Sequence, residues 1–535
     1  MVPAFSALFK KYSTLIYILA LTLTAGGALF PSTKSTWVFN DDYQQFAENP
    51  LVLESGHWSD FFTRNTGEVL SPPKRSSIYR PIYLLTYKFE ARTWGLSPFV
   101  TRLVNLAIHL TLTLTLFFTI RSFTCARNAW IGSMLFSLHP IVAEPVAWSS
   151  GRHELMLGLG VALLLYVLQR KEPIWAWPLI LVGGLVKETF LPVAASLMAI
   201  YCYFMWTEYR RSFLPMRKKD ILAIALALMS FLAVIMIRYQ VLREWFFGFP
   251  SFSIVGRNLL FTLARYFEVL LLPWRSGVFM ADIHSPIGLA RLFCLGLGCL
   301  GLLGIVISLF KPREDDALSF KLMSLSVFFV PLFTVSLVAD LAGHIHDRYF
   351  YVSHLALSMM AGTASPRGDL SSYRKYFFTT VFLGLLGGLI YLSFVSSRHW
   401  QTYPQTIQRI LEETPTNPQV YLEAAQFSLR VNDPYQAKKH LRSLLERSPQ
   451  NTWARNVLAV LLIYHRELDE ALVHLKQAYA IDPRSPDTSF NLGFYFENKG
   501  DVPKAKESYE QTLQLNPHHG KAREALDRLD RQKQK

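Results

Sequence analysis

The sequence predicts an all-α protein in two parts, a polytopic membrane helical bundle followed by a C-terminal solenoid of helical repeats. Of 535 residues, 51% are hydrophobic and only 17% are charged, which is too apolar for a soluble chain of this length. Apolar stretches fill the first part of the chain, whereas prolines recur at a fixed interval in the last part. We therefore expect a transmembrane domain over 1–398 and a repeat domain over 399–535.

Apolar stretches of membrane-spanning length recur through the first domain. A helix needs about 20 apolar residues to cross the hydrocarbon core. Stretches of this order lie near 13–30, 99–120, 128–147, 153–169, 173–206, 220–238, 287–310, 318–341, 347–364 and 376–396. The stretch 173–206 is long enough for two crossings with a turn at Lys187 and Glu188, so we expect about 11 transmembrane helices.

Basic residues between these stretches predict the orientation. The loops around 10–11, 121–127, 170–171, 210–219, 311–321 and 367–375 fall on one side if 257–273 dips into the membrane or lies flat on it. We therefore expect a cytoplasmic N-terminus, with the first outer loop 31–98 and the repeat domain on the outer face. The same loops explain the net charge of +15, so we expect no nucleic-acid partner.

The last part of the chain carries the 34-residue period of tetratricopeptide repeats (TPR). Prolines 415, 449, 483 and 517 stand at this interval, as do alanines 437, 471 and 505. The period predicts repeats at about 418–451, 452–485 and 486–519, with a capping helix at 519–531. Three stacked repeats and a polar last helix suffice to bury a continuous core.

Ionisable side chains near the outer ends of the membrane helices are candidate site residues, because such groups are costly at membrane depth. Asp41 and Asp42 directly follow the first apolar stretch, and Arg102 shares one helical face with Asn105 and His109. A purely structural role is an open alternative both for the two aspartates and for the residues on the Arg102 face. The aspartates could cap the helix that begins at Tyr43, and the Arg102 stripe could hydrogen-bond between helices.

Three further segments of the outer face add charged and aromatic residues. They are 136–154 with His139, Glu144, Arg152, His153 and Glu154; 185–192 with Lys187 and Glu188; and 343–354 with His344, His346, Asp347, Arg348, Tyr349 and Tyr351. Alternatives remain open here too: metal ligation by His139, Glu144 and His153, pairing of Lys187 with Glu188, and an interfacial belt around Arg348.

Together these residues describe one outer cavity that holds carboxylates and cations beside a bilayer. Such a cavity suits transfer from a phosphate-linked lipid. A carboxylate takes the proton of the acceptor or binds a divalent metal, while cations stabilise the departing lipid phosphate.

The chain resembles the transmembrane-and-TPR O-mannosyltransferases and their bacterial relatives, which are integral-membrane glycosyltransferases of the GT-C fold that use polyprenyl-phosphate sugars. The resemblance runs from about residue 37 to the end of the chain. It rests on FNDDYQQFAENPLV (39–52), SIYRPIYLLTYKFEARTWGLSPFVTRLVNLAIHL (77–110), LFSLHPIVAEPVAWSSGRHELMLGL (135–159), LVKETFLPVAA (185–195) and HDRYFYVSHLAL (346–357), followed by the repeats.

The resemblance implies roles for these residues. It matches Asp41 and Asp42 to the catalytic or metal-binding acid of the first outer loop, Glu144 or Glu154 to a second acid, and Arg348 and Lys187 to contacts of the carrier phosphate. The candidate residues are therefore Asp41, Asp42 and Glu144 for catalysis, and Arg80, Arg102, His139, Arg152, Glu154, Lys187, Glu188, His346 and Arg348 for substrate binding; a divalent metal could bind at Asp41 and Asp42.

The sequence differs from the animal relatives at two motifs: they commonly have Asp where this chain has His153-Glu154, and KEQ where it has KET. They also carry more repeats. These departures leave the sugar and the acceptor open. We expect a glycosyltransferase, in a bacterial inner membrane with a periplasmic repeat domain or else in the endoplasmic reticulum, whose repeats recruit the acceptor or a protein partner. The rival hypothesis is a non-catalytic membrane scaffold for an envelope or polysaccharide-export complex. A glycolipid transporter ranks third, because the polar groups cluster on the outer half only.

Overall fold

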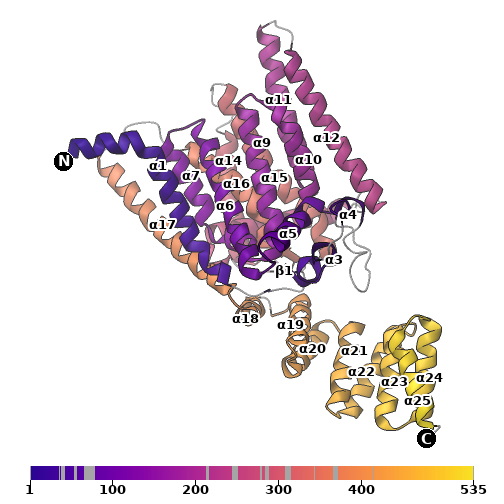
Figure 1. Cartoon of the computed structure of the whole chain (residues 1–535). Helices are drawn as coiled ribbons and strands as arrows, with labels where there is room; N and C mark the ends of the chain where they lie inside the picture. Colours follow the sequence, from indigo (N-terminus) through magenta and orange to yellow (C-terminus); the bar gives the residue numbers. More distant parts are fainter. Residues whose placement is uncertain are drawn as a thin grey trace. The chain divides into compact units, whose positions relative to one another are not determined.

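The structure is a computed structural model, which describes residues 2–34, 37, 42–53, 57–64, 79–212, 216–243, 251–276, 280–282, 288–307, 315–342, 344–364, 372–413 and 415–533. It divides the chain into two compact units, Met1–Arg409 and Ile410–Lys535. Both units are built from helices (Figure 1). The all-α fold class predicted from the sequence is confirmed.

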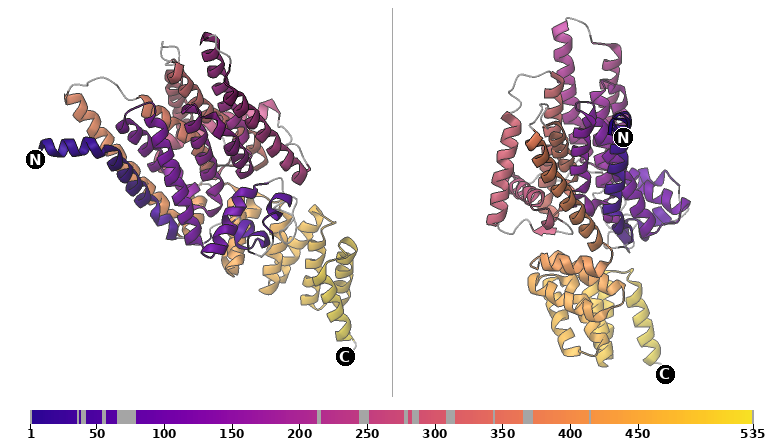
Figure 2. Two further views of the ribbon diagram at one scale, coloured as in Figure 1. Left: turned by 45° about the horizontal axis from the view of Figure 1, so that its top comes forward. Right: turned by 90° about the vertical axis from the view of Figure 1, so that its left-hand side faces the viewer.

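The first unit is a bundle of long apolar helices. They are α1 (Val2–Leu29), α6 (Pro98–Arg121), α7 (Ala126–Leu138), α9 (Arg152–Gln169), α10 (Ala176–Val186), α11 (Phe190–Ser212), α12 (Lys218–Leu242), α14 (Leu289–Ile307), α15 (Asp315–Ala342), α16 (Tyr351–Ala364) and α17 (Ser372–His399). The first and last of these, α1 and α17, lie alongside each other although they are far apart in the sequence (Figures 1 and 2).

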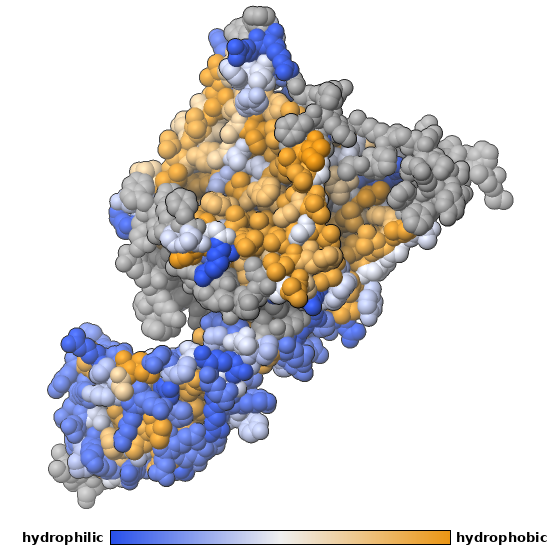
Figure 3. All heavy atoms as spheres, turned by 180° about the vertical axis from the view of Figure 1, so that it is seen from behind, coloured by the Kyte–Doolittle hydropathy of each residue, from blue (hydrophilic) through white to orange (hydrophobic). Residues whose placement is uncertain are grey.

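Within the described residues, eight helices are long and apolar enough to cross a membrane. The other predicted crossings coincide with the shorter helices α7, α10 and α16, so the count of about 11 remains a prediction. Helix α13 (Phe252–Leu271) carries Arg257, Arg265 and Glu268 and is not one of the eight. Figure 3 shows hydrophobic side chains across the visible face of the bundle and mostly hydrophilic ones on the repeat unit. The first unit therefore has the surface of an integral membrane protein.

The predicted crossing at 128–147 ends earlier than its hydropathy suggests. Helix α7 ends at Leu138, and Pro140 begins a run of short turns: η4 (Pro140–Val142), α8 (Ala143–Ala147) and η5 (Ser149–Gly151). Proline interrupts the hydrogen bonding of a helix, and a Cβ on Gly151 would stand 2.7 Å from the Pro145 carbonyl oxygen, so glycine permits this fold-back. Glu144 consequently lies outside the membrane-crossing helices.

Smaller elements gather at the same end of the bundle. They are η1 (Phe30–Lys34), η2 (Tyr43–Ala47), α3 (Pro50–Leu53), α4 (Asp60–Thr63), α5 (Pro81–Thr93), η7 (Pro273–Arg275), β1 (Met280–Asp282), β2 (His344–His346) and η9 (Asp347–Phe350). The short η6 (Pro173–Trp175) lies elsewhere, between the end of α9 and the start of α10. Residues of α3, α4 and α5 form an apolar core in which Tyr87 stacks on Phe46 at 4.3 Å between ring centroids. Strands β1 and β2 pair antiparallel with Ala281 opposite Ile345.

The second unit confirms the predicted TPR solenoid. Its helices are α18 (Tyr403–Glu413), which begins in the first unit, α19 (Pro418–Arg430), α20 (Pro434–Arg447), α21 (Thr452–Tyr464), α22 (Leu468–Ile481), α23 (Pro486–Lys499), α24 (Val502–Leu515) and α25 (Gly520–Lys533). Side chains of Asn417, Asp433, Asn451, Ser485 and Asp501 cap the helices that follow them. The period recognised in the sequence thus corresponds to stacked helix pairs.

A close contact inside the third pair yields a stability prediction. A Cβ on Gly493 would stand 2.6 Å from the ring of the buried Tyr509. We expect Gly493→Ala to destabilise the repeat unit by about 1–3 kcal/mol because the ring must shift. Gly520→Ala is the control, since open space surrounds Gly520. Hydrogen exchange of α23 and α24 in the full chain measures the difference, and equal protection of the two variants would contradict the prediction.

Candidate active site

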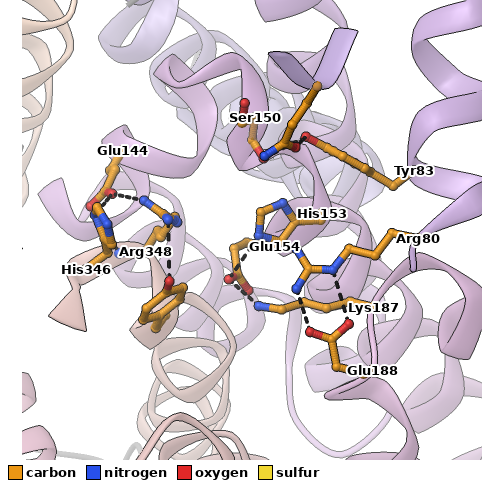
Figure 4. A network of polar contacts seen from close by, with 12 residues as sticks. Arg80, Tyr83, Glu144, Ser150, His153, Glu154, Lys187, Glu188, His346 and Arg348 are labelled. Carbon is orange, nitrogen blue, oxygen red and sulfur yellow. Dashed lines mark hydrogen bonds and ion pairs between the residues drawn. The ribbon is translucent and has the colours of Figure 1, made fainter. Parts of the chain in front are cut away.

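A polar cluster is built where the turns between the helices meet. Its side chains come from the residue before α5, from α8, from the start of α9, from the link between α10 and α11, and from β2 and η9 (Figure 4). The sequence analysis placed all these segments on the outer face. Because alternate helices of the bundle begin or end there, residues that are 100 to 200 positions apart come into contact.

Asp42 is the carboxylate at one side of this cluster. It is fully buried, and its Oδ1 accepts hydrogen bonds from the Ser150 amide (3.1 Å) and the Ser150 hydroxyl (2.7 Å). The Tyr83 hydroxyl donates to the carbonyl oxygen of the same Ser150 at 3.2 Å. Arg102 interacts electrostatically with Asp42. Asp41 lies outside the described residues.

Lys187 and Glu154 form the second part of the cluster. The Lys187 ammonium donates to Oε1 of Glu154, and His153 Nε2 lies 3.5 Å from the same oxygen. The three side chains are buried. Burial lowers the pKa of Lys187, and the charge of Glu154 opposes this shift. Lys187 therefore belongs to a buried ion pair with a residue of another helix.

Arg80 and Glu188 form the third part. Arg80 donates to both carboxylate oxygens of Glu188, at 3.1 Å from Nε and 2.5 Å from a terminal nitrogen, and Arg238 lies 3.9 Å from Oε2. Burial alone would raise the pKa of Glu188, but Arg80, with smaller effects of Arg238 and Lys187, holds this pKa far below its usual range. Lys187 and Glu188 therefore have separate partners, which contradicts the open alternative that they simply pair with each other.

Glu144 and Arg348 form the fourth part. Glu144 accepts from the Arg348 guanidinium at 2.9 Å and from the Arg348 amide at 3.1 Å, and His346 Nδ1 lies 3.2 Å from Oε1. The Arg348 guanidinium carbon stands 3.8 Å from the centroid of the Trp148 ring. The Tyr349 ring joins this part to the second, since Arg348 lies 4.9 Å and Lys187 5.4 Å from its centroid. Two cations thus flank one aromatic ring.

The environment of Glu144 predicts a pH dependence. Burial raises the pKa of Glu144 to about 8, against the opposing effect of Arg348. Below that pH the group is protonated and holds Arg348 weakly; above it the carboxylate forms and the ion pair is complete. We expect any activity that requires Arg348 to rise between pH 7 and 9, and to lose this rise in Glu144→Gln. A pH profile with the same rise in both proteins would contradict the prediction.

Three other candidates have contacts that are structural in kind. Arg152 forms an ion pair with Glu90 at 2.5 Å and lies 4.1 Å from the Tyr87 ring centroid. Arg102 donates to the Ala147 carbonyl oxygen at 2.5 Å. His139 accepts from the Ile141 amide at 3.2 Å, and its ring centroid lies 4.7 Å from that of His354. Substrate roles for Arg102, Arg152 and His139 remain predictions.

Among the residues that the structure describes, no group of three His, Cys, Asp or Glu side chains could hold a metal ion. The hypothetical set of His139, Glu144 and His153 is therefore not such a group. A metal at Asp41 and Asp42 remains a prediction, because Asp41 lies outside the described residues.

Four residues that shape the cluster were not predicted from the sequence: Trp148, which stacks on Arg348; Tyr83 and Ser150, which contact each other beside Asp42; and Arg265 of α13, which binds Asp347. Only Arg265 carried a signal, as one of three charged residues in a largely apolar stretch. The other three have uncharged side chains, whose role depends on a partner distant in sequence.

The fold and cluster define an integral-membrane helical protein with a buried ionic site and a TPR solenoid. No family model matches the chain. It is 31% identical to human protein O-mannosyl-transferase TMTC1 over 122 residues, 22% of this chain and 14% of that protein. Human protein O-mannosyl-transferase TMTC3 is 23% identical over 523 residues, 89% of this chain and 53% of that protein.

The chain is thus similar to the protein O-mannosyl-transferases that the sequence motifs indicated, and spans about half of TMTC3 and a smaller part of TMTC1. Among solved structures, ArnT from Cupriavidus metallidurans bound to undecaprenyl phosphate aligns with 94% of this chain and 81% of its own, at 13% identity and a TM-score of 0.43.

Proposed function

We propose that the chain is an integral-membrane glycosyltransferase that moves a sugar from a polyprenyl-phosphate donor to an acceptor hydroxyl. The names of its relatives support transfer of a sugar. One observation carries the proposal for this chain: a continuous series of contacts leads from the carboxylate of Asp42 through Ser150, Tyr83, His153, Glu154 and Lys187 to Tyr349 and Arg348. This series joins the Asp42 carboxylate and two cations in one cluster, which supports their roles as base and phosphate contacts.

Asp42 is the proposed general base. The acceptor oxygen attacks the anomeric carbon of the donor, the bond from this carbon to the phosphate oxygen breaks, and the acceptor proton passes to the Asp42 carboxylate. The polyprenyl phosphate leaves with the bonding electrons. The hydrogen bonds from Ser150 fix the orientation of the carboxylate, and one base with one phosphate site suffices for a single displacement.

Arg348 and Lys187 are the proposed contacts of the phosphate. Among the described residues, Arg348 Nε is buried and has no hydrogen-bond partner, so it has a donor available for a phosphate oxygen. Glu144 and the Trp148 ring hold the rest of the guanidinium in place. Guanidinium groups bind phosphate through directed, charge-assisted hydrogen bonds. Loss of the negative charge on Glu144 would loosen Arg348, and loss of that on Glu154 would loosen Lys187. In this scheme Glu144 is a positioning residue.

The repeat unit is proposed to recruit the acceptor or a protein partner. The pattern of basic loops supports a cytoplasmic N-terminus with the cluster and the repeats on the outer face, in a bacterial inner membrane or, alternatively, in the endoplasmic reticulum. On this topology the donor lipid reaches the cluster from within the bilayer.

Mass spectrometry of protein and lipid glycans tests the proposal in cells that carry the native chain, Asp42→Asn or no chain, at matched membrane levels. We expect the Asn variant to lose the same sugar mass as the deletion, and that mass identifies the sugar. A native glycan pattern in the Asn variant would reject Asp42 as the base. If the deletion also leaves all glycans unchanged, the scaffold hypothesis replaces the transferase.

A further inference from the structure

Arg348 is the centre of the proposed phosphate site, and its position depends on more than its own side chain. Glu144 binds both its guanidinium and its main-chain amide, so the carboxylate fixes the backbone as well as the head group. Two residues earlier, His346 pairs with Met280 in the two-stranded ribbon. The backbone that carries Arg348 is thus held from two sides.

The preceding residue, Asp347, is held from a third side. Its carboxylate accepts from Arg265 Nε at 3.0 Å and from a terminal nitrogen of Arg265 at 2.9 Å, which is a bidentate pair. The two side chains are 1% and 2% exposed. Two consecutive residues of η9 therefore bind different elements: Asp347 binds α13, whereas Arg348 binds α8.

Arg265 is itself fixed by further bonds. It donates to Glu268 at 3.0 Å and to the Arg275 carbonyl oxygen at 3.0 Å, and Arg275 and Arg291 each reach Glu268 at 2.6 Å. Helix α13 is not among the helices that meet the membrane-crossing criterion, and no candidate of the sequence analysis lies on it. The ionic network on α13 needs an explanation that the proposed chemistry does not supply.

We propose that Arg265 and Asp347 are a positioning pair, through which α13 holds the η9 turn so that Arg348 meets the phosphate of a polyprenyl-phosphate ligand. The inference rests on the proposed function of Arg348. A bidentate pair of buried charges is a directional contact, and loss of either partner removes both hydrogen bonds that join the η9 turn to α13. The turn would then relax, and the guanidinium would lose its place on Trp148 and Glu144.

Binding of undecaprenyl phosphate to the full chain in lipid nanodiscs tests this inference. We expect Asp347→Asn to raise the Kd about 10-fold, and Arg265→Lys, which keeps the charge but only one bond, to raise it by less. Asp220→Asn is the matched control, because Asp220 is also buried and bound by an arginine, Arg217 at 2.7 Å, but belongs to α12. Thermal unfolding of each variant shows whether it is folded. If Asp347→Asn does not fold, the Kd of Arg265→Lys alone tests the inference.

The two proposals fail in different ways. Folded variants of Asp347 and Arg265 that bind within twofold of the native Kd, while Arg348→Gln loses binding, would overturn the positioning pair and leave the phosphate contact standing. Native affinity in Arg348→Gln would overturn the phosphate contact itself. A rise in Kd for Asp220→Asn equal to that for Asp347→Asn would make the effect one of general stability and would also overturn the inference.

Discussion

Replacing Asp42 by Asn is expected to slow sugar transfer by about 10²- to 10⁴-fold, the usual contribution of a general base. The amide has the size of the carboxylate, and its oxygen can still accept from the Ser150 amide and hydroxyl, so the fold should persist. It cannot take the proton of an acceptor hydroxyl. Initial rates of transfer by the purified full chain, with the lipid-linked sugar identified in cells as donor, measure the effect.

Asp220→Asn provides the control for this experiment. Asp220 is buried like Asp42 and accepts from Arg217 and from the Tyr209 hydroxyl, but it belongs to α12 and makes none of the contacts described for the cluster. We expect its transfer rate to stay within about threefold of the native rate, the size of a modest indirect effect. Similar rates in the two Asn variants would remove the basis for a catalytic role of Asp42.

The second large effect is expected for Arg348→Gln, in the affinity for the carrier phosphate. Hydrogen bonds to charged groups contribute about 1.5–3 kcal/mol, so the Kd of undecaprenyl phosphate should rise about 10- to 100-fold. The substitution also leaves Glu144 without its cation, which should destabilise the fold, although protonation of this carboxyl limits the loss. Isothermal titration in detergent or nanodiscs measures the affinity.

Arg217→Gln is the control for this second prediction. Arg217→Gln also removes an arginine that binds a carboxylate, but at the start of α12. We expect its Kd for undecaprenyl phosphate to equal that of the native chain. An unchanged Kd in Arg348→Gln, or an equal rise in both variants, would show that Arg348 does not contact the phosphate.

The fold class could be predicted from the sequence because each of its two parts has a one-dimensional signal. Runs of apolar residues indicate membrane helices, and the spacing of Pro415, Pro449, Pro483 and Pro517 indicates stacked helix pairs. Hydropathy failed at 128–147, where the apolar run continues past the end of α7. Helix α7 ends just before Pro140, because proline cannot continue the hydrogen bonding of a helix, although the residues beyond it are still apolar.

The site could be predicted only as a set of segments, since the partners of charged residues depend on the tertiary fold. Lys187 and Glu188 are adjacent in the sequence, yet one binds Glu154 and the other Arg80. Glu144 is a predicted catalytic acid, and its partner Arg348 lies 204 residues further along the chain. The catalytic role of Glu144 remains a prediction. Arg265 was missed for the same reason, because its partner Asp347 is 82 residues further along the chain.

We propose that this chain breaks the bond between a sugar and a polyprenyl phosphate with Asp42 as the base. The most direct test follows the lipid pool by mass spectrometry in proteoliposomes that contain the purified full chain, the lipid-linked sugars of its host membrane and the acceptor fraction. We expect the native chain to convert lipid-linked sugar into free polyprenyl phosphate, and Asp42→Asn to do so at least about 100-fold more slowly. An unchanged lipid pool with the native chain, or equal conversion by the Asn variant, would contradict the proposal.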